Sequence, residues 1–229
     1  MSAASAEIAK LSLNCFITMK IAFANAIGDV ADRTPGADKS HILECVGSDA
    51  RVGKRCLQPG YGFGGPCFPR DNRAFGLYAS KVGAPALLCE TTDEANKRHA
   101  TLMVEALLAE EREEYLFEDV AYRPGCPVDM IEESQPLEVA KVLAHRGKKV
   151  TIKDRVGIVT LVRRTYGSLF SYQVADPASG SSSVNGSSCA DGSSANVHAP
   201  AGVLGKRARN PHDTRSDTSM GNPLSSYRR

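Results

Sequence analysis

The segment between residues 8 and 30 constrains the fold of this chain more than any other. Its apolar residues recur at steps of three and four, which is the spacing of one face of a helix: Ile8, Leu11, Cys15, Met19, Ala22, Phe23, Ala26, Ile27 and Val30. The other side of the same helix carries Leu13, Phe16, Ile17 and Ile21. A helix that is apolar nearly all round has to be buried, in a large core or against another subunit. We therefore expect residues 5–33 to form the interface of a homodimer or higher oligomer.

A polar stripe interrupts this apolar helix. Lys10, Asn14, Thr18 and Asn25 are separated by four, four and seven residues, which places them on one side of the helix. On the ordinary interpretation, the lysine keeps its charge in water at the helix end and the asparagines bond to nearby backbone. On the alternative interpretation, the stripe lines a functional site.

A glycine-rich loop with one cysteine, "GYGFGGPCFPRD", favours the second interpretation. Glycines let backbone N–H groups approach a ligand closely, and such a surface suits sugar hydroxyls or phosphate oxygens. Pro69 is typical of the first residues of a helix, so Cys67 would lie just before a helix N-terminus, where the thiolate is favoured. Asp71 follows one helical turn later, where a carboxylate can orient water or take up a proton. The alternatives are that the glycines form an ordinary surface loop and that Cys67 is a small buried residue. The length of the motif and its many functional side chains favour a functional site instead.

Composition limits the classes of partner. The chain has 229 residues and a net charge of +2, which indicates no nucleic-acid partner. We expect no membrane partner either, because no run approaches the ~20 apolar residues of a membrane span, and because the opening "MSAASAEIAK" lacks the order of a secretory signal. A cytoplasmic location follows. The seven cysteines are scattered without a C-x-x-C pair, so we expect no metal site and mostly reduced, buried thiols.

The pattern divides the chain into three regions. Residues 5–110 are expected to form a mainly helical central domain, with a second helix at residues 37–46. Residues 111–154 are expected to form a truncated α/β (Rossmann-like) segment: the strand "YLFEDVAY", a helix at residues 138–145 ended by Gly147, and the strand "KKVTIKD". Residues 155–229 are rich in Ser, Gly, Asn and Arg, and we expect a disordered or aberrant tail there.

Four stretches carry a family resemblance: "AEIAKLSLNCF", "GSDARVG", "PGYGFGGPCFPRDN" and "IEESQPLEVAKVLAHRGKKVTIKD". Over residues 5–154 the chain resembles the UDP-glucose/GDP-mannose dehydrogenase family, the NAD-dependent 6-dehydrogenases of nucleotide sugars. In that family an N-terminal Rossmann domain binds NAD, a central helical domain carries the cysteine and forms the dimer, and a C-terminal domain binds the nucleotide. The resemblance implies oxidation of a nucleotide sugar at C6 to the uronic acid, with NAD as cofactor. This chain starts where the central domain starts, so we expect a fragment that is inactive in isolation.

The resemblance also implies residue roles. Cys67 would add to the aldehyde as a thiohemiacetal, and a thioester would follow that water hydrolyses. Lys10 would stabilise the oxyanion, while Asn14 and Asp71 would position water and assist proton transfer. Substrate contacts are implied for Arg51, acting from the partner subunit, and for Gln58, Pro59, Gly60, Tyr61, Gly62, Phe63, Gly64, Tyr122 and Arg123. Cofactor contacts are implied for Pro66, Cys67, Phe68 and Pro69.

Some positions depart from the family pattern. Arg123 stands where the family has a substrate-contacting lysine, and Glu132 stands where it has an NAD-contacting arginine. No G-x-G-x-x-G follows any expected strand.

Three hypotheses therefore stay open. The first is a fragment of a nucleotide-sugar dehydrogenase, with UDP-glucose favoured over UDP-N-acetylmannosamine and GDP-mannose. The second is a non-catalytic dimerisation and regulatory module that pairs with a full-length dehydrogenase. The third, a cysteine hydrolase, ranks last because His41, His99 and His145 show no supporting motif.

Overall fold

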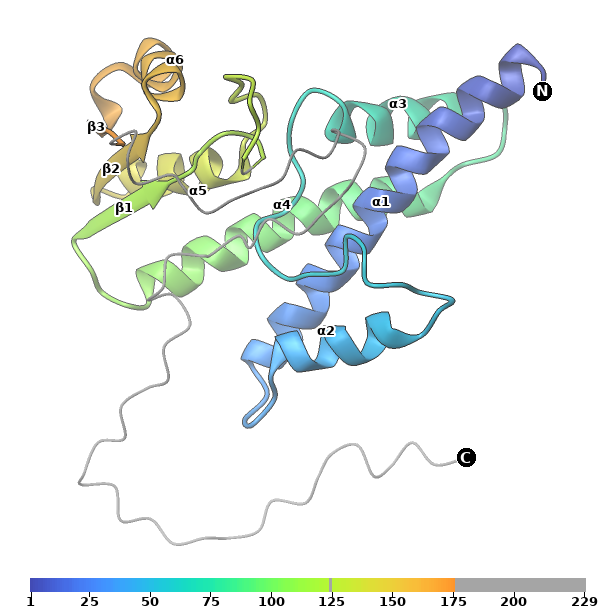
Figure 1. Cartoon of the computed structure of the whole chain (residues 1–229), viewed down its shortest axis with the longest axis horizontal. Coiled ribbons are helices and arrows are strands. Elements are labelled where there is room, and N and C mark those ends of the chain that lie inside the picture. The colour runs from blue at the N-terminus through green and yellow to red at the C-terminus, as the bar shows by residue number, and fades with distance from the viewer. Residues whose placement is uncertain (124, 176–229) are drawn as a thin grey trace, which may run out of the picture.

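The computed structural model describes residues 1–123 and 125–175, which form a helical part and a small α/β part (Figure 1). The helical part contains α1 (Ala3–Asp32), α2 (Lys39–Ser48), α3 (Phe68–Lys81) and α4 (Leu87–Leu108). The α/β part contains β1 (Glu114–Glu118), α5 (Gln135–His145), β2 (Lys149–Asp154), α6 (Val156–Tyr166), a short 3-10 helix (Gly167–Leu169) and β3 (Ser171–Val174). The expected class, mainly helical and then α/β, is confirmed.

Helix α1 is the long helix that the apolar spacing predicts. It starts at Ser2, whose hydroxyl accepts a hydrogen bond from the N–H of Ser5. One side of α1 packs against α3 and α4, and the side chains of Asn14, Thr18 and Asn25 are buried there. The opposite side exposes large apolar side chains, among them Phe16 (56% exposed) and Phe23 (46% exposed). The sequence pattern therefore predicts the helix correctly but not its faces, because Cys15 and Ala22 of the expected apolar face are buried while Phe23 of the same face is exposed.

Helix α1 is also long and apolar enough to cross a membrane, by length and composition. The expectation that no run of this chain meets that criterion is wrong. Core helices of soluble proteins meet it too. The polar residues of α1 hydrogen-bond to α3 and to the loop before it, which is the behaviour of a helix packed against protein.

The next two helices have the local signals expected of them. Helix α2 begins two residues later than predicted, because the side chain of Asp38 caps it by accepting from the N–H of His41 at 2.9 Å. Helix α3 begins directly after Cys67, with Pro69 in its first turn. Cys67 is therefore the N-cap residue of α3, as predicted.

The α/β part is a three-stranded parallel sheet in the order β1-β2-β3. Tyr115 lies opposite Val150, and Ile152 lies opposite Tyr172. The predicted strand–helix–strand unit is thus confirmed as β1, α5 and β2. Its core is continuous with Val104 and Leu107 from the end of α4, so α4 packs in both parts of the molecule (Figure 1).

Residues 155–174 do not begin a tail. Ile158, Val159 and Val162 of α6 are buried, and Phe170 joins them in the core of the sheet. The expectation of disorder from residue 155 is wrong for this segment. Helix α6 has only a short apolar face, which gives little signal in the sequence, but β2 and β3 cover that face in the structure. The rest of the expected tail, residues 176–229, lies outside the described residues.

Candidate active site

The buried polar residues of α1 bond to α3. Asn14 Nδ2 donates to Asp71 Oδ2 at 2.6 Å, and Asn72 Nδ2 donates to Thr18 Oγ1 at 2.8 Å. The carboxyl of Asp71 is almost fully buried, with 4% of the residue exposed. A buried carboxylate is costly unless it is hydrogen-bonded, so Asn14 has a defined task at this position. Two residues of the predicted stripe, Asn14 and Thr18, thus face the helix that follows the cysteine.

Cys67 and Asp71 belong to the first turn of α3. The N–H of Asp71 donates to the carbonyl of Cys67 at 2.8 Å. Cys67 is exposed, and its side chain makes no capping bond to the helix. An accessible thiol therefore stands at the open N-terminus of a helix, one turn from a buried carboxyl.

Arg70 is a member of this group that the sequence reasoning missed. Its Nε donates to Asp71 Oδ1 at 3.0 Å, and the guanidinium lies near enough to Cys67 to interact with it. The bond to Asp71, and then the charge of Asp71, raise the pKa of Arg70 above its usual value. The available signal was the basic residue next to the aspartate in the cysteine motif. This cation lies beside both the thiol and the acid.

Two predicted residues are not brought to Cys67. Lys10 is exposed on α1, one turn before Asn14, and within the described part of the chain no hydrogen bond or ion pair joins it to Cys67 or Asp71. Arg51 is exposed after α2 and pairs with Asp49, with 2.7 Å between Arg51 Nη2 and Asp49 Oδ2. That pairing lowers the pKa of Asp49 and raises that of Arg51. The roles given to Lys10 and Arg51 stay predictions.

The glycine loop does not present its backbone as expected. The N–H of Gly60 donates to Asn25 Oδ1 at 2.9 Å, and the N–H of Gly62 donates to Gln135 Oε1. The N–H of Gly65 donates to the carbonyl of Glu132 at 3.0 Å. The expectation that these three N–H groups meet a ligand is wrong in this structure, because side chains and backbone distant in sequence already accept from them.

Close packing explains the glycines instead. A Cβ on Gly62 would collide with the side chains of Asn96 and Gln135, and a Cβ on Gly64 would collide with the carbonyl of Glu133. Gly65 has φ +83°, and a Cβ there would enter the ring of Tyr122. The loop is therefore pressed against α4 and against the segment that precedes α5. Tyr122, which is predicted to contact substrate, touches the loop in this way.

His99 also holds the loop, although no sequence motif indicated it. Its Nε2 lies 2.7 Å from the carbonyl oxygen of Gly60, and its Nδ1 lies 3.0 Å from Asp29 Oδ2. Asn96, one turn earlier on α4, bonds to both the N–H and the carbonyl of Phe63 at 3.0 and 2.9 Å. Helices α1 and α4 therefore clamp the loop from two sides.

The remaining predicted residues have mixed exposure. Gln58 is exposed, while Pro59, Tyr61, Pro66, Phe68 and Arg123 are partly buried. Burial raises the pKa of the Tyr61 hydroxyl above its usual value. Phe63 is buried, and Pro69 is fully buried, so the side chain of Pro69 presents no surface to a cofactor in this structure. The contact implied for Pro69 does not fit, because its ring packs inside the first turn of α3.

The sheet of the described residues does not fit NAD. An acid at the end of a strand can hold a ribose, but the two oxygens of Asp154, which ends β2, already accept from backbone N–H groups. Its Oδ2 accepts from the N–H of Val120 and its Oδ1 from the N–H of Arg155, each at 2.7 Å. Burial raises the pKa of this carboxyl. The loop from β1 to α5 carries Gly125 as its single glycine, so it has no phosphate-binding glycine turn.

Comparison with known proteins agrees with this geometry. Residues 4–98 match the UDP-glucose/GDP-mannose dehydrogenase family, central domain. Residues 4–98 thus form a central domain of this family, and the likeness extends toward the C-terminus. The matched residues include α1 from its second residue onward, all of α2 and α3, the glycine loop and Cys67.

Individual members of the UDP-glucose/GDP-mannose dehydrogenase family extend the likeness toward the C-terminus. The UDP-glucose 6-dehydrogenase TuaD of Bacillus subtilis is 40% identical over 104 residues, covering 45% of this chain and 22% of TuaD. The UDP-glucose 6-dehydrogenase of Rhizobium meliloti is 30% identical over 159 residues, covering 67% of this chain and 36% of that protein. A solved UDP-glucose dehydrogenase from Pyrobaculum islandicum aligns with a TM-score of 0.69 and 31% identity, covering 78% of this chain and 41% of that one. The chain thus spans well under half the length of these relatives.

Proposed function

We propose that this chain supplies the cysteine and the substrate loop of an NAD-dependent nucleotide-sugar 6-dehydrogenase, with UDP-glucose as the favoured substrate. The observation that carries the proposal is the buried 2.6 Å hydrogen bond from Asn14 to Asp71, one turn from the exposed Cys67 at the N-cap of α3. A nucleophile, an acid and a positioned amide lie together, as hydrolysis of a covalent intermediate requires.

The residues of this chain have the following tasks in the proposal. The thiolate of Cys67 adds to the C6 aldehyde, forming a sulfur–carbon bond, while the carbonyl oxygen takes up a proton to give a thiohemiacetal. Once that adduct has been oxidised to a thioester, Asp71 removes a proton from a water molecule that Asn14 helps to orient, and the acid is released. Arg70 stands beside the sulfur and the carboxylate, and Lys10 supplies charge to the oxyanion. Both oxidations need a hydride acceptor, which NAD would supply when bound beside Cys67.

The other predicted residues complete the proposal. Residues 58–64 hold the sugar and diphosphate, Tyr122 and Arg123 contact the nucleotide sugar, and Arg51 reaches the substrate of a partner subunit. Pro66, Cys67 and Phe68 border the cofactor. The division at residue 110 between a central domain and a nucleotide-binding segment belongs to the same proposal.

Ligand protection of Cys67 tests substrate binding. Iodoacetamide labelling followed by peptide mass spectrometry reports each cysteine separately, and Cys45 on α2 is an exposed control in the same chain. UDP-glucose at about ten times its Kd should slow the labelling of Cys67 about tenfold and leave Cys45 unchanged. UDP-N-acetylmannosamine and GDP-mannose, tested in parallel, identify the preferred nucleotide sugar. Equal labelling of Cys67 with and without all three ligands would contradict the proposal.

A second assay tests the chemistry. The chain alone should form no NADH from UDP-glucose, whereas the chain joined to a dinucleotide-binding domain of a relative such as TuaD should form it. In the joined protein, Cys67→Ser should block formation of the acid, because serine is a far weaker nucleophile than a thiolate. Normal acid production with Ser at position 67 would overturn the assignment.

The exposed apolar side chains of α1, among them Phe16 and Phe23, favour a second candidate, a non-catalytic module that pairs with a complete dehydrogenase. Co-expression with a tagged full-length relative distinguishes the two. A stable mixed dimer whose activity is unchanged by Cys67→Ser in this chain supports the module. A mixed dimer whose activity falls with Cys67→Ser supports the enzyme.

A further inference from the structure

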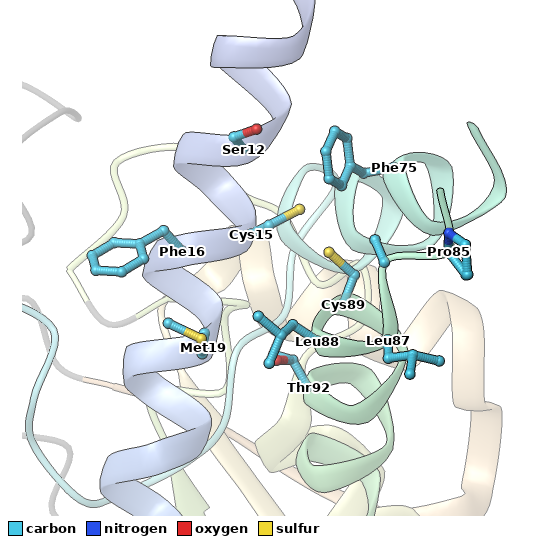
Figure 2. A pocket seen from close by; sticks show the side chains of 11 residues that line it. Ser12, Cys15, Phe16, Met19, Phe75, Pro85, Leu87, Leu88, Cys89 and Thr92 are labelled. Carbon is cyan, nitrogen blue, oxygen red and sulfur yellow. The ribbon is translucent and has the colours of Figure 1, made fainter. Parts of the chain in front are cut away.

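Two cysteines face each other on the buried side of α1, away from the role given to Cys67. Cys15 of α1 and Cys89 of α4 are both buried, and Figure 2 shows their sulfur atoms pointing toward one another. They line one pocket of about 430 Å³, whose other walls include Phe16, Met19 and Phe75. Two thiols from different helices therefore share one apolar cavity.

The surroundings of Cys15 hold the proton on its sulfur. Burial, and then the hydrogen bond with Cys89, raise the pKa of Cys15 to about 12. Cys15 Sγ also lies 3.8 Å from the carbonyl oxygen of Asp71, toward which its S–H can donate. Cys15 is thus held as the protonated thiol, the less reactive form of a cysteine, so we assign the first step to the neighbouring sulfur of Cys89.

We propose that Cys15 and Cys89 form a dithiol modification site, which a small uncharged peroxide converts into a disulfide between α1 and α4. The Cys89 sulfur attacks one peroxide oxygen, the O–O bond breaks, and the thiol proton passes to the departing oxygen, so a sulfenic acid and one water molecule result. The Cys15 sulfur then displaces hydroxide from that sulfenic acid, and the proton of Cys15 leaves with it as water. Two thiols lose two electrons in total, and one peroxide is reduced to two water molecules.

The walls of the pocket select the oxidant. All eleven lining residues are apolar or carry an uncharged polar group: Ser12, Cys15, Phe16, Met19, Phe75, Pro85, Ala86, Leu87, Leu88, Cys89 and Thr92. A charged oxidant such as glutathione disulfide would lose its hydration there without a compensating partner. Hydrogen peroxide or a small organic hydroperoxide is neutral, so it enters without that cost.

Oxidation also acts on the candidate active site, and this consequence rests on the proposed function. A disulfide removes the S–H that faces the carbonyl of Asp71 and ties Cys15 to α4. Asn14, the neighbour of Cys15 on α1, donates to the carboxyl of that same Asp71. We expect the Asn14–Asp71 pair to shift, and nucleotide-sugar protection of Cys67 to change with it.

Peptide mass spectrometry of the full chain tests the site. The protein is treated with hydrogen peroxide, blocked with N-ethylmaleimide and digested without reductant. The expected product is a cross-linked peptide pair containing Cys15 and Cys89, two hydrogens lighter than the reduced pair, which dithiothreitol reverses. Cys15→Ser and Cys89→Ser should each abolish it, and the exposed control Cys45→Ser should not.

Phenylarsine oxide gives a second measurement that needs no variant, because one trivalent arsenic bridges two adjacent thiols. A single adduct spanning Cys15 and Cys89 in the wild-type chain is expected. Absence of both the disulfide and the adduct, or cross-links that join other cysteines equally well, would overturn the proposal. If the disulfide forms but no nucleotide sugar protects Cys67 in the reduced protein, the dithiol site stands and the proposed function fails.

Discussion

Asp71 shows how a single residue depends on its surroundings. Its carboxyl is buried, and each oxygen has its own donor: Oδ2 accepts from Asn14, and Oδ1 accepts from Arg70. Arg70 is largely exposed, whereas Asn14 is buried with Asp71. Water can replace the donor that Arg70 provides more easily than the donor that Asn14 provides. Asn14 is therefore the more sensitive member of the pair.

The prediction at this scale concerns Asn14→Leu. The substitution keeps side-chain volume but leaves Asp71 Oδ2 buried without its donor, so the free energy of unfolding should fall by about 1–3 kcal/mol. Urea denaturation followed by circular dichroism measures it. Glu7→Ala, at an exposed position of the same helix, is the control and should stay within about 0.5 kcal/mol of wild type. A loss for Asn14→Leu no larger than the control's would contradict the assigned role.

At the scale of elements, the glycine loop acts as a joint between helices. It is bonded to α1 through Asn25, to α4 through Asn96 and His99, and to α5 through Gln135. Its glycines let backbone, side chain and ring approach without a Cβ between them. The loop therefore sets the position of Cys67 relative to both parts of the molecule.

The prediction for this joint compares Gly65→Ala with Gly36→Ala. Both glycines have positive φ, +83° and +80°, so both substitutions carry the same backbone strain. Only Gly65 faces an atom within contact distance, the ring of Tyr122, while a Cβ on Gly36 meets nothing within 4 Å. Gly65→Ala should therefore cost about 1–3 kcal/mol more than Gly36→Ala. Thermal denaturation of both variants measures the difference, and equal losses would show that the loop is not pressed against Tyr122.

For the whole molecule, the exposed side of α1 is the main feature left without a partner in the described chain. Ile8, Leu13, Phe16, Phe23 and Val30 are each at least 41% exposed along this one helix. Apolar patches of this extent usually mark an interface between proteins. A second copy of the chain, packed α1 against α1, would cover the patch on both copies at once.

The corresponding prediction is a homodimer that dissociates when α1 is made polar. Phe16→Glu combined with Phe23→Glu should shift the protein from dimer to monomer at micromolar concentration, as measured by sedimentation velocity. Val128→Glu changes an equally exposed apolar residue in the other part of the molecule and should leave the dimer intact. A wild-type chain that sediments as a well-folded monomer would contradict the interface.

Local signals in the sequence determine several features of this protein. The spacing of apolar residues determines α1, Pro69 and its neighbours determine that Cys67 caps α3, and Gly147 with φ +81° marks the turn between α5 and β2. Each of these depends on residues within one or two helical turns, so no knowledge of the fold is needed. Other features depend on residues 35 to 74 positions apart: the pairing of Asn14 with Asp71, the acceptors of the glycine N–H groups, the contacts of His99, and the approach of Cys15 to Cys89. The burial of α6 depends on the neighbouring strands. Only the tertiary structure decides these, because helix and strand periods say which face is apolar but not which other face will cover it.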